Sequence, residues 1–386
     1  MNKVRVGVIY PMPKEHGVSI RINRLVSKLP PNFEIEEIVQ EKWNYSFFGK
    51  VFYLLRQLAL INNNEFNPDI IIGVAPLLTG SIPSLYARYL KKVPLIMDWD
   101  DSYQNFREHT PSLWEIAYWE YRAVKGADCV VVVSKNLFKN TEYIRRSSKN
   151  IYYIPNGVDT SQFDSKRFNR NHIKTKLGMK NKALIITFVS HIGIFNGEFV
   201  GAELAKASIE LINKHDDLIF LIIGYGDGLQ LFKKFVKDND IEKHYYFTGF
   251  VNNKELPKYL SISDICIDAI LNMNPKSIQR KPFNLKNRSS MKLKEYMAMK
   301  KAAIAGNIGE NIIDLDSGKA GILIEHSYKS LASALEILIN NENLRKKLGI
   351  AARIRVKRHY ELKNQAKLLG KIILQFLPTK HLKNIS

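Results

Sequence analysis

Short apolar runs rich in β-branched residues alternate with helical stretches along most of the chain, and this alternation constrains the fold more than any other feature. In the first half the candidate strands are residues 4–10, 69–74, 94–98, 129–133 and 151–154. Helical stretches at 19–29, 82–90 and 113–124 lie between them. Strands that are apolar throughout are typical of parallel sheets covered by helices on both faces. The sequence therefore predicts an α/β, doubly wound, Rossmann-like domain.

The same alternation begins again in the second half. Its candidate strands are residues 184–189, 218–223, 244–248, 265–268, 302–305 and 321–324. Its helical stretches are residues 200–214, 229–238, 255–261, 291–299 and 328–340. A chain of 386 residues exceeds what one hydrophobic core usually organises, so we expect two domains. The polar, basic stretch 164–182 reads as the linker, which gives domains at 1–168 and 169–350, followed by a helical segment at 351–386.

The net charge of +21 is concentrated in two places. Residues 276–301 hold nine Lys and Arg and one acid, and residues 344–386 hold twelve and one. A local basic excess is typical of proteins that meet phosphate or an anionic surface. No recognisable nucleic-acid-binding module accompanies the charge, so we expect no nucleic-acid partner.

The two cysteines, Cys129 and Cys266, lie inside apolar strand-like runs, where a buried inert thiol is the usual outcome. Two cysteines exclude a disulfide framework and a zinc cluster. The chain passes directly from Met1 into an apolar strand, and no stretch reaches the length of a membrane-spanning helix. We expect a cytoplasmic protein, in contact with the membrane at most from its cytoplasmic face.

Several motifs, in this order and spacing, carry a resemblance to a known family. They are ADCVVVVS at 127–134, IPNGVDTSQF at 154–163, FLIIGYGDG at 220–228, MKLKEYMAMKKAAIAG at 291–306 and GKAGILIE at 318–325. Together they resemble the retaining GT-B glycosyltransferases of glycosyltransferase family 4, also described as glycosyl transferases group 1. The resemblance implies two Rossmann-like domains facing a central cleft, with the acceptor in the first and the nucleotide-sugar donor in the second. It also implies a C-terminal helix that crosses back to the first domain.

The resemblance places the donor around the predicted helix 291–299. Lys292 and Glu295 are three residues apart and so share a face of this helix. Arg288 and Ser290 stand at its start, where free backbone N–H groups suit a diphosphate. In the family, the glutamate that matches Glu295 binds the ribose hydroxyls. The complete set of expected donor-binding residues is His191, Gly193, Asn196, Gly224, Gly226, Arg288, Ser290, Lys292 and Glu295.

The sequence departs from the family pattern at Asn287, His191 and Asn196. Asn287 stands where the family has a glutamate that touches the donor sugar, and an amide there can still hydrogen-bond sugar hydroxyls. His191 and Asn196 stand where the family has an arginine and a lysine on the diphosphate. Their loss weakens phosphate binding, because charge-assisted hydrogen bonds are stronger than neutral ones. We expect cations of the basic segment 276–301, such as Lys286, Arg288 and Lys292, to compensate.

In the first domain, Gly17 and Arg21 are the expected acceptor-binding residues. Gly17 lies in the turn after the first strand, and Arg21, one turn into the next helix, either meets an acceptor phosphate or is a solvated helix residue. The expected catalytic residues are Asn287, Asp98 at the end of the strand 94–98, and Asp100 just after it. The two aspartates would orient the acceptor or stabilise positive charge at the anomeric carbon. Two alternatives remain open: aspartates that cap the next helix, and a D-x-D site for Mg²⁺ or Mn²⁺, although we expect no metal cofactor.

The aromatic stretch 42–61, punctuated by Lys50 and Arg56, is either an ordinary packing helix or a helix that lies in the interface of an anionic membrane. The sequence thus predicts transfer, with retention, from a nucleotide-diphosphate sugar to a glycan or a lipid-phosphate-linked acceptor. The product would be a cell-surface polysaccharide, glycolipid or lipid-linked glycan. The alternatives are a metal-dependent D-x-D transferase, or a non-catalytic GT-B-like basic protein that binds membrane or nucleic acid.

Overall fold

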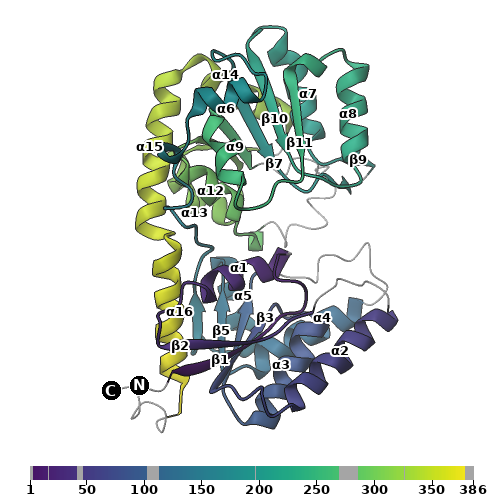
Figure 1. Cartoon of the computed structure of the whole chain (residues 1–386), viewed down its shortest axis with the longest axis vertical. Helices are drawn as coiled ribbons and strands as arrows, with labels where there is room; N and C mark the ends of the chain where they lie inside the picture. Colours follow the sequence, from purple (N-terminus) through teal and green to yellow (C-terminus); the bar gives the residue numbers. More distant parts are fainter. Residues whose placement is uncertain are drawn as a thin grey trace. The chain divides into compact units, whose positions relative to one another are not determined.

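The computed structural model describes residues 3–15, 17–40, 47–101, 113–195, 197–268, 286–325 and 327–378. The chain forms two compact units (Figure 1). Unit 1 contains residues 1–157, 282–289 and 362–386, and unit 2 contains residues 158–281 and 290–361. The boundaries between units thus fall after residues 157 and 361, whereas the sequence placed domain boundaries after 168 and 350.

Unit 1 is built on a six-stranded parallel sheet with strand order β2-β1-β3-β4-β5-β6. Its strands are β1 (Val4–Ile9), β2 (Phe33–Ile38), β3 (Ile70–Val74), β4 (Leu95–Trp99), β5 (Cys129–Val132) and β6 (Ile151–Tyr153). The sequence analysis missed β2, whose FEIEEI pattern is acidic. This strand pairs only with β1, in register from Val4 with Phe33 to Ile9 with Ile38, and its edge position tolerates the polar side chains.

Helices cover both faces of this sheet. They are α1 (Gly17–Val26), α2 (Phe47–Asn62), α3 (Leu78–Lys91), α4 (Leu113–Gly126), α5 (Lys135–Arg145) and α16 (Leu362–Phe376). Helices α1 and α16 contact each other and share one core with the sheet. The other four helices form a second layer, in which α2 contacts α3, α3 contacts α4, and α4 contacts α5. The second core forms between this second layer of helices and the strands of the sheet. The order of strands and helices is that of a doubly wound Rossmann-like domain.

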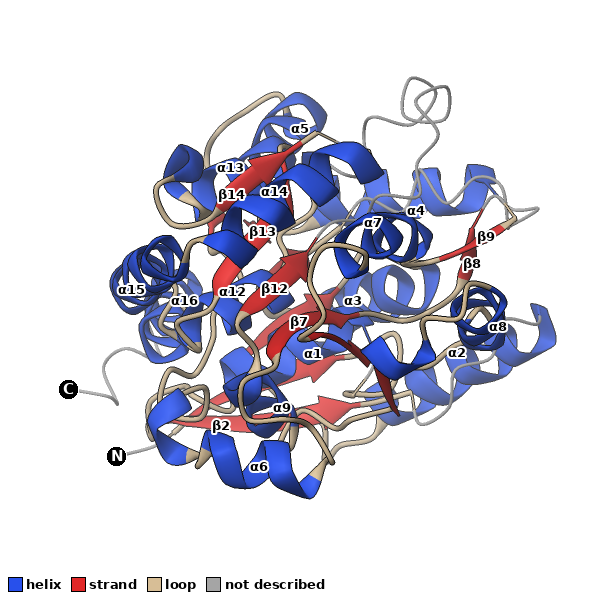
Figure 2. Cartoon of the chain, turned by 90° about the horizontal axis from the view of Figure 1, so that it is seen from above, coloured by secondary structure: helices blue, strands red, loops and turns tan. Residues whose placement is uncertain are grey.

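Unit 2 repeats the architecture with strand order β11-β10-β7-β12-β13-β14. The sheet strands are β7 (Leu184–Val189), β10 (Leu218–Ile223), β11 (Tyr245–Gly249), β12 (Ile265–Asp268), β13 (Ala302–Gly306) and β14 (Ile322–Ile324). All neighbours pair in parallel, and Figure 2 shows β7, β12, β13 and β14 side by side. A short antiparallel pair, β8 (Ile194–Phe195) and β9 (Glu198–Phe199), follows β7. The two predicted Rossmann-like domains are confirmed.

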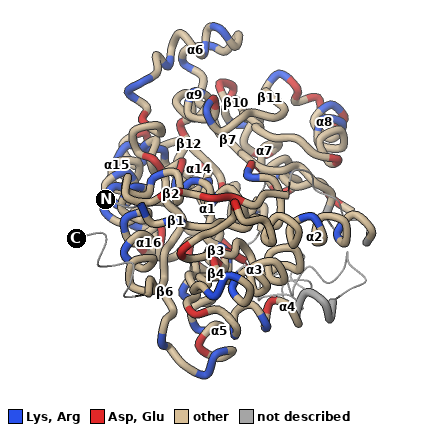
Figure 3. The backbone as a smooth tube through the Cα atoms, turned by 60° about the horizontal axis from the view of Figure 1, so that its bottom comes forward, with Lys and Arg blue, Asp and Glu red and all other residues tan. Residues whose placement is uncertain are grey.

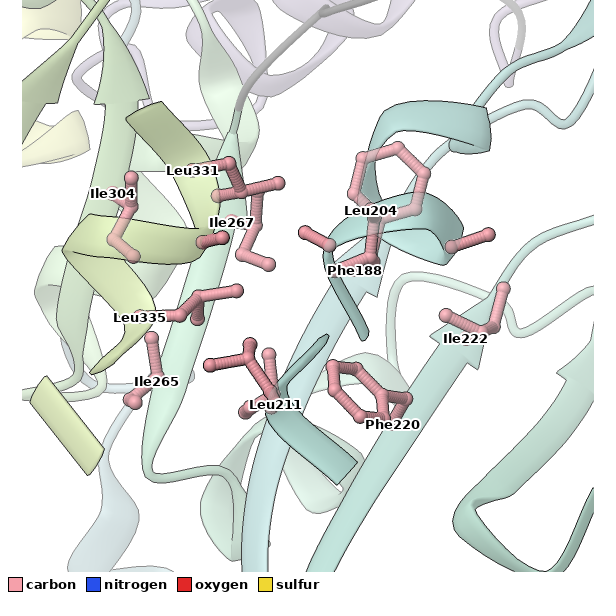
Figure 4. Close-up of a cluster of buried hydrophobic side chains, with 14 of the residues drawn as sticks. Phe188, Leu204, Leu211, Phe220, Ile222, Ile265, Ile267, Ile304, Leu331 and Leu335 are labelled. Atoms are coloured by element: carbon pink, nitrogen blue, oxygen red, sulfur yellow. The ribbon is translucent and has the colours of Figure 1, made fainter. Parts of the chain in front are cut away.

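The helices of unit 2 enclose two buried clusters. They are α6 (Arg170–Lys176), α7 (Ala202–Ile212), α8 (Leu229–Asp238), α9 (Leu256–Ile262), α12 (Met291–Ala298), α13 (Glu310–Asp314), α14 (Tyr328–Asn340) and α15 (Glu342–His359). Figure 4 shows one cluster, in which Leu204 and Leu211 of α7 and Leu331 and Leu335 of α14 meet the apolar side chains of the strands. Cys266 lies in the other cluster, where burial raises the pKa of its thiol to about 12.

The stretch 164–182 is not a linker. It contains α6, and Ile173 and Met179 are buried in the core of unit 2. Lys174 is buried as well, because its ammonium donates to the carbonyls of Asn181 at 2.8 Å and Ala183 at 2.6 Å. A buried lysine that bonds local carbonyls looks like a solvated charge in the sequence, which explains the wrong prediction.

The basic stretch at the C-terminus forms two helices. Helix α15 ends at His359 in unit 2, and α16 begins at Leu362 in unit 1. At the break, Glu361 accepts a hydrogen bond from the Thr160 hydroxyl, and the Tyr360 carbonyl accepts one from the Val158 amide. In unit 1, Leu369 and Ile373 of α16 pack in the core beside β1, as the predicted return of this segment requires.

Candidate functional site

The carboxyl edge of the sheet in unit 2 is the place where this fold can hold a ligand. Strand β7 comes first in the sequence of unit 2, its next partner β10 lies on one side, and β12 lies on the other. The strand order therefore reverses at β7, and the loops after β7 and β12 diverge there. In open parallel sheets such a switch point, at the carboxyl ends of the strands, is the usual position of a binding crevice.

The loop after β7 is locked to the loop after β10 by backbone hydrogen bonds. Ile192 N–H donates to the Tyr225 carbonyl and Gly228 N–H donates to the Ile192 carbonyl, both at 2.8 Å. Gly224 has φ +153°, and a Cβ there would lie 1.8 Å from the Ser190 carbonyl oxygen. Only glycine fits such an approach. The predicted donor residues Gly193, Gly224 and Gly226 do come together, as the framework of these two loops.

Three aromatic rings line up along the same edge. The His191 ring packs edge-to-face on Tyr225, with centroids 5.4 Å apart, and Tyr225 packs in the same way on Phe250 at 5.2 Å. All three side chains are exposed. Exposed rings of this kind can stack on a nucleotide base or a sugar. Of these three residues the sequence indicated only His191, although Tyr225 stands inside the motif 220–228.

Helix α12 begins at this edge, because it leads from the carboxyl edge of the sheet into the start of β13. The Ser290 hydroxyl caps the helix by accepting from Leu293 N–H at 3.2 Å. Val189 N–H, at the end of β7, donates to the Tyr296 hydroxyl at 3.3 Å and ties the helix to that strand. Glu295 is buried and Lys292 is half-buried, so these two predicted donor-binding residues differ in their access to solvent. Leu293, Tyr296 and Met297 are in the core.

A fully buried ion pair fixes the other side of α12. Lys294 Nζ lies 2.6 Å from Asp314 Oδ2 and 5.0 Å from the centroid of the Tyr360 ring. Burial raises the pKa of the Tyr360 hydroxyl, and the nearby Asp314 carboxylate raises it further. Removing one partner of a buried pair leaves the other charge uncompensated, so the pair holds α12 on α13 firmly. The sequence analysis assigned Lys294 no role.

In unit 1, Asp98 and Arg21 form a buried pair at the carboxyl edge of the sheet. Arg21 is 3 % exposed and Asp98 is 1 % exposed. The Arg21 Nε donates to both Asp98 oxygens at 3.2 Å, and its two terminal nitrogens donate to Asn156 Oδ1 at 3.2 Å and to the Ile154 carbonyl at 2.8 Å. Burial raises the pKa of Asp98 and the Arg21 guanidinium opposes this rise.

These contacts correct two sequence-based assignments. The sequence predicts Arg21 on the surface, either at an acceptor phosphate or in solvent. In the structure its guanidinium is buried and hydrogen-bonded to other residues of unit 1. Asp98 was expected to act on substrate, but it neutralises Arg21 in the interior. We regard both as positioning residues of unit 1. Asp100 follows β4 and is half-buried.

The D-x-D alternative rested on Asp98 and Asp100 with Trp99 between them. Asp98 is bound to a guanidinium, and the buried Trp99 indole N–H donates to Glu120 Oε1 at 3.0 Å. Among the described residues, no group of three or more His, Cys, Asp or Glu side chains is arranged to hold a metal ion. Asp98 is thus a poor candidate for a metal ligand.

The segment just before α12 packs on unit 1. The buried Asn287 Oδ1 accepts from Asn136 Nδ2 at 2.5 Å and from Asn140 Nδ2 at 3.4 Å, both on α5. The Ser289 carbonyl accepts from Asn156 Nδ2 at 2.7 Å. Asn287 was expected to act on substrate; its side-chain oxygen instead anchors this segment. Asn136 and Asn140, four apart on one helix face, went unnoticed in the sequence because their partner lies far along the chain.

The remaining predicted residues are placed as follows. Gly17 starts α1 with φ +32°, a conformation that favours glycine. Arg288 is half-buried in the segment that packs on unit 1. Asn196 and residues 276–285 of the basic segment lie outside the described residues.

Two family models match the chain, one for each half. The model described as Glycosyltransferase Family 4 matches residues 5–162, and the model described as Glycosyl transferases group 1 matches residues 169–355. The two matches are adjacent and cover most of the sequence. They meet in the region where the chain passes from unit 1 to unit 2.

Relatives and solved structures agree with these matches. The chain is 27 % identical over 252 residues to an uncharacterized glycosyltransferase of Methanocaldococcus jannaschii, covering 64 % of the chain and 58 % of that protein. It is 23 % identical over 148 residues to the alpha-monoglucosyldiacylglycerol synthase of Acholeplasma laidlawii, covering 38 % of the chain and 36 % of the synthase. The crystal structure of Anabaena HepE in complex with UDP superposes with a TM-score of 0.74 at 12 % identity, over 96 % of this chain and 100 % of that one. The matched regions thus span about a third and just over half of the two curated relatives.

Proposed function

We propose that the chain, whose two halves match glycosyltransferase family models and whose fold is that of the GT-B glycosyltransferases, transfers a sugar from a nucleotide-diphosphate sugar to an acceptor hydroxyl. The observation that carries the proposal is the carboxyl edge of the sheet in unit 2. There, two interlocked glycine loops, a row of exposed rings and the start of α12 surround the switch point of the sheet. The HepE protein, with the same fold, is in complex with UDP, which supports a nucleotide donor for this chain.

In this proposal the donor lies with its diphosphate at the start of α12. Backbone N–H groups at a helix start attract anions, and Lys292 adds a cation one residue further on. Glu295 accepts hydrogen bonds from the ribose hydroxyls, and the rings of Tyr225 and Phe250 meet the base. Gly193, Gly224 and Gly226 let the backbone approach the donor closely, and His191 and Asn196 bind it as neutral donors.

The reaction proceeds with retention and without a metal ion, as the resemblance to family 4 implies. Asp98 is the partner of Arg21, so catalysis depends mostly on positioning the substrates and neutralising the charge of the leaving phosphate. The cations of segment 276–301 stand in for the missing arginine and lysine of the family. Asp100 orients the acceptor, and Gly17 lets it approach the turn after β1.

The acceptor is a glycan or lipid-phosphate-linked molecule at the cytoplasmic face of a membrane. The name of the Acholeplasma relative describes a glycolipid synthase, which supports a lipid acceptor. The basic stretches at 276–301 and 344–386 suit an anionic acceptor or an anionic surface. The product then belongs to the cell envelope.

A thermal-shift panel of UDP-, GDP-, ADP- and dTDP-sugars, each with and without Mg²⁺, tests the proposal. One donor class should raise the unfolding temperature of the wild type without needing Mg²⁺, because a ligand that binds only the folded state stabilises it. Glu295→Gln should remove that shift, whereas Glu255→Gln, an exposed glutamate at the start of α9, should keep it. No shift with any donor would contradict the proposed function, and a shift that requires Mg²⁺ would contradict metal independence.

A further inference from the structure

Helix α2 exposes a row of large apolar side chains to solvent. Phe48 is 83 % exposed, Phe52 is 62 % exposed and Leu55 is 61 % exposed. These positions are four and three residues apart, so they lie on one side of the helix, and the exposed Ala59 continues the row. A row from residue 48 to 59 is about 17 Å long at 1.5 Å per residue. We call these four residues the α2 apolar row.

The side of α2 that faces the protein includes a polar residue among its buried positions. Gln57 is 2 % exposed and donates from Nε2 to the Tyr10 carbonyl at 3.0 Å, and Ile61 is buried beside it. A helix selected only to pack on its sheet buries its aromatic residues and exposes its glutamine. Helix α2 buries Gln57 but leaves Phe48 and Phe52 in solvent, so the exposed row fits a contact outside unit 1.

The charges near the row are positive. Helix α2 contains Lys50 and Arg56 and no acidic residue (Figure 3). In the same layer of helices, α4 carries the exposed Tyr118 and Tyr121, with Arg122 5.9 Å from the Tyr118 ring centroid and Lys125 5.2 Å from that of Tyr121. Aromatic and aliphatic side chains mixed with cations match the interface of a bilayer that contains anionic lipid.

We propose that α2 docks unit 1 on an anionic membrane by lying in the plane of the interface, with the α2 apolar row inserted among the acyl chains. No helix in the described part of the chain is long and apolar enough to cross a bilayer. Arg56 is exposed and stays at the headgroups, since long basic side chains reach outward from a buried stem. The docking deepens the proposed function because it brings unit 1 to a lipid acceptor, but it needs no donor and no turnover.

Flotation with vesicles tests the docking. The full chain is mixed with vesicles of phosphatidylcholine alone, or of phosphatidylcholine with phosphatidylglycerol, and the bound fraction is measured after centrifugation. The wild type should float with the anionic vesicles and much less with the neutral ones. The double variant Phe52→Ser with Leu55→Ser should bind roughly tenfold more weakly, which corresponds to about 1.4 kcal/mol.

Two further variants separate the causes. Leu231→Ser with Ile337→Ser removes two exposed apolar side chains of unit 2, on α8 and α14, and should float like the wild type. Arg56→Glu with Arg122→Glu, which reverses two exposed cations of α2 and α4, should lose most of the preference for anionic vesicles. All substituted positions are exposed, so we expect all three variants to fold. Far-UV circular dichroism and its thermal unfolding curve verify the fold of each variant independently of lipid.

Three results would overturn the docking. The first is equal flotation of the wild type and the Phe52→Ser, Leu55→Ser variant. The second is an equal loss of binding in the unit 2 control. The third is a wild type that ignores vesicles and forms a dimer that the α2 variant abolishes, which would make the row a contact between copies of the chain. A failed donor screen beside normal flotation would reject the proposed function and leave the docking intact.

Discussion

Replacing Arg21 with Met should destabilise unit 1 strongly, because Arg21 is the cation that neutralises the buried Asp98. The substitution keeps the aliphatic stem but removes three sets of hydrogen bonds, to Asp98, to the Ile154 carbonyl and to Asn156. Breaking a buried ion pair by removal of one partner costs about 3–5 kcal/mol. That loss is a large fraction of the roughly 5–15 kcal/mol by which domains are stable.

The chain is well suited to this measurement because all four tryptophans, including the buried Trp99 of β4, lie in the sequence of unit 1. Urea unfolding followed by tryptophan fluorescence therefore reports on unit 1. Asp98→Asn serves as the second mutation of a double-mutant cycle. Because the double variant buries no charge, Arg21→Met should cost about 1–3 kcal/mol less in the Asp98→Asn background than in the wild type.

The cost should also depend on pH. Without Arg21, burial alone acts on Asp98 and holds its folded-state pKa above the unfolded value of about 3.9. The folded state then binds more protons than the unfolded state, so the stability contributed by protonated Asp98 is lost as the pH rises through that pKa. The deficit of Arg21→Met should be smaller at pH 5 than at pH 8. Additive costs in the cycle, within about 0.5 kcal/mol, would refute the reasoning.

Three further predictions concern single sites. Gly224→Ala should destabilise unit 2 by more than about 2 kcal/mol and abolish the donor-induced thermal shift, since its Cβ would strike the Ser190 carbonyl; the tryptophan signal of unit 1 should not change. Burial lowers the pKa of Lys301 to about 8, so the unfolded state binds more protons above that pH. The stability of the wild type relative to Lys301→Met should therefore rise by about 2 kcal/mol between pH 8 and pH 10, and a flat difference in urea titrations would speak against it. Asn287→Ala should lower the free energy of unfolding of unit 1 by about 1–3 kcal/mol, because it leaves the amide of Asn136 without its acceptor. If the variant unfolds like the wild type when followed by fluorescence, Asn287 does not anchor this segment.

Hydrophobic periodicity in the sequence predicted most of the strands and helices. Apolar runs such as Leu184–Val189 and Leu218–Ile223 match the strands β7 and β10, and the helix Leu229–Asp238 was placed at its observed bounds. The errors occurred where tertiary contacts reverse a local signal. The acidic β2 is stable as an edge strand, and Lys174 is buried by bonding carbonyls a few residues away. These contacts do not appear in a hydropathy pattern.

The site was less predictable because its contacts join distant parts of the chain. The glycines of the two loops were identified from the resemblance, and the structure explains them by backbone contacts. Nothing in the sequence indicated that Arg21 would find Asp98 across 77 residues, or Asn287 find Asn136 across 151. Residue types alone suggested an exposed arginine and a reactive aspartate, and only the fold turns them into a buried pair.

The direct test of the account is the binding of UDP to Glu295→Gln, measured by isothermal titration against the wild type and against Glu255→Gln. In the proposed donor site, the ribose lies at Glu295, on the carboxyl edge of the sheet in unit 2. It predicts that UDP binds the wild type and Glu255→Gln with the same affinity, and that Glu295→Gln binds roughly tenfold or more weakly, since a charge-assisted bond is lost. Unchanged affinity in Glu295→Gln, with UDP bound by the wild type, would contradict it.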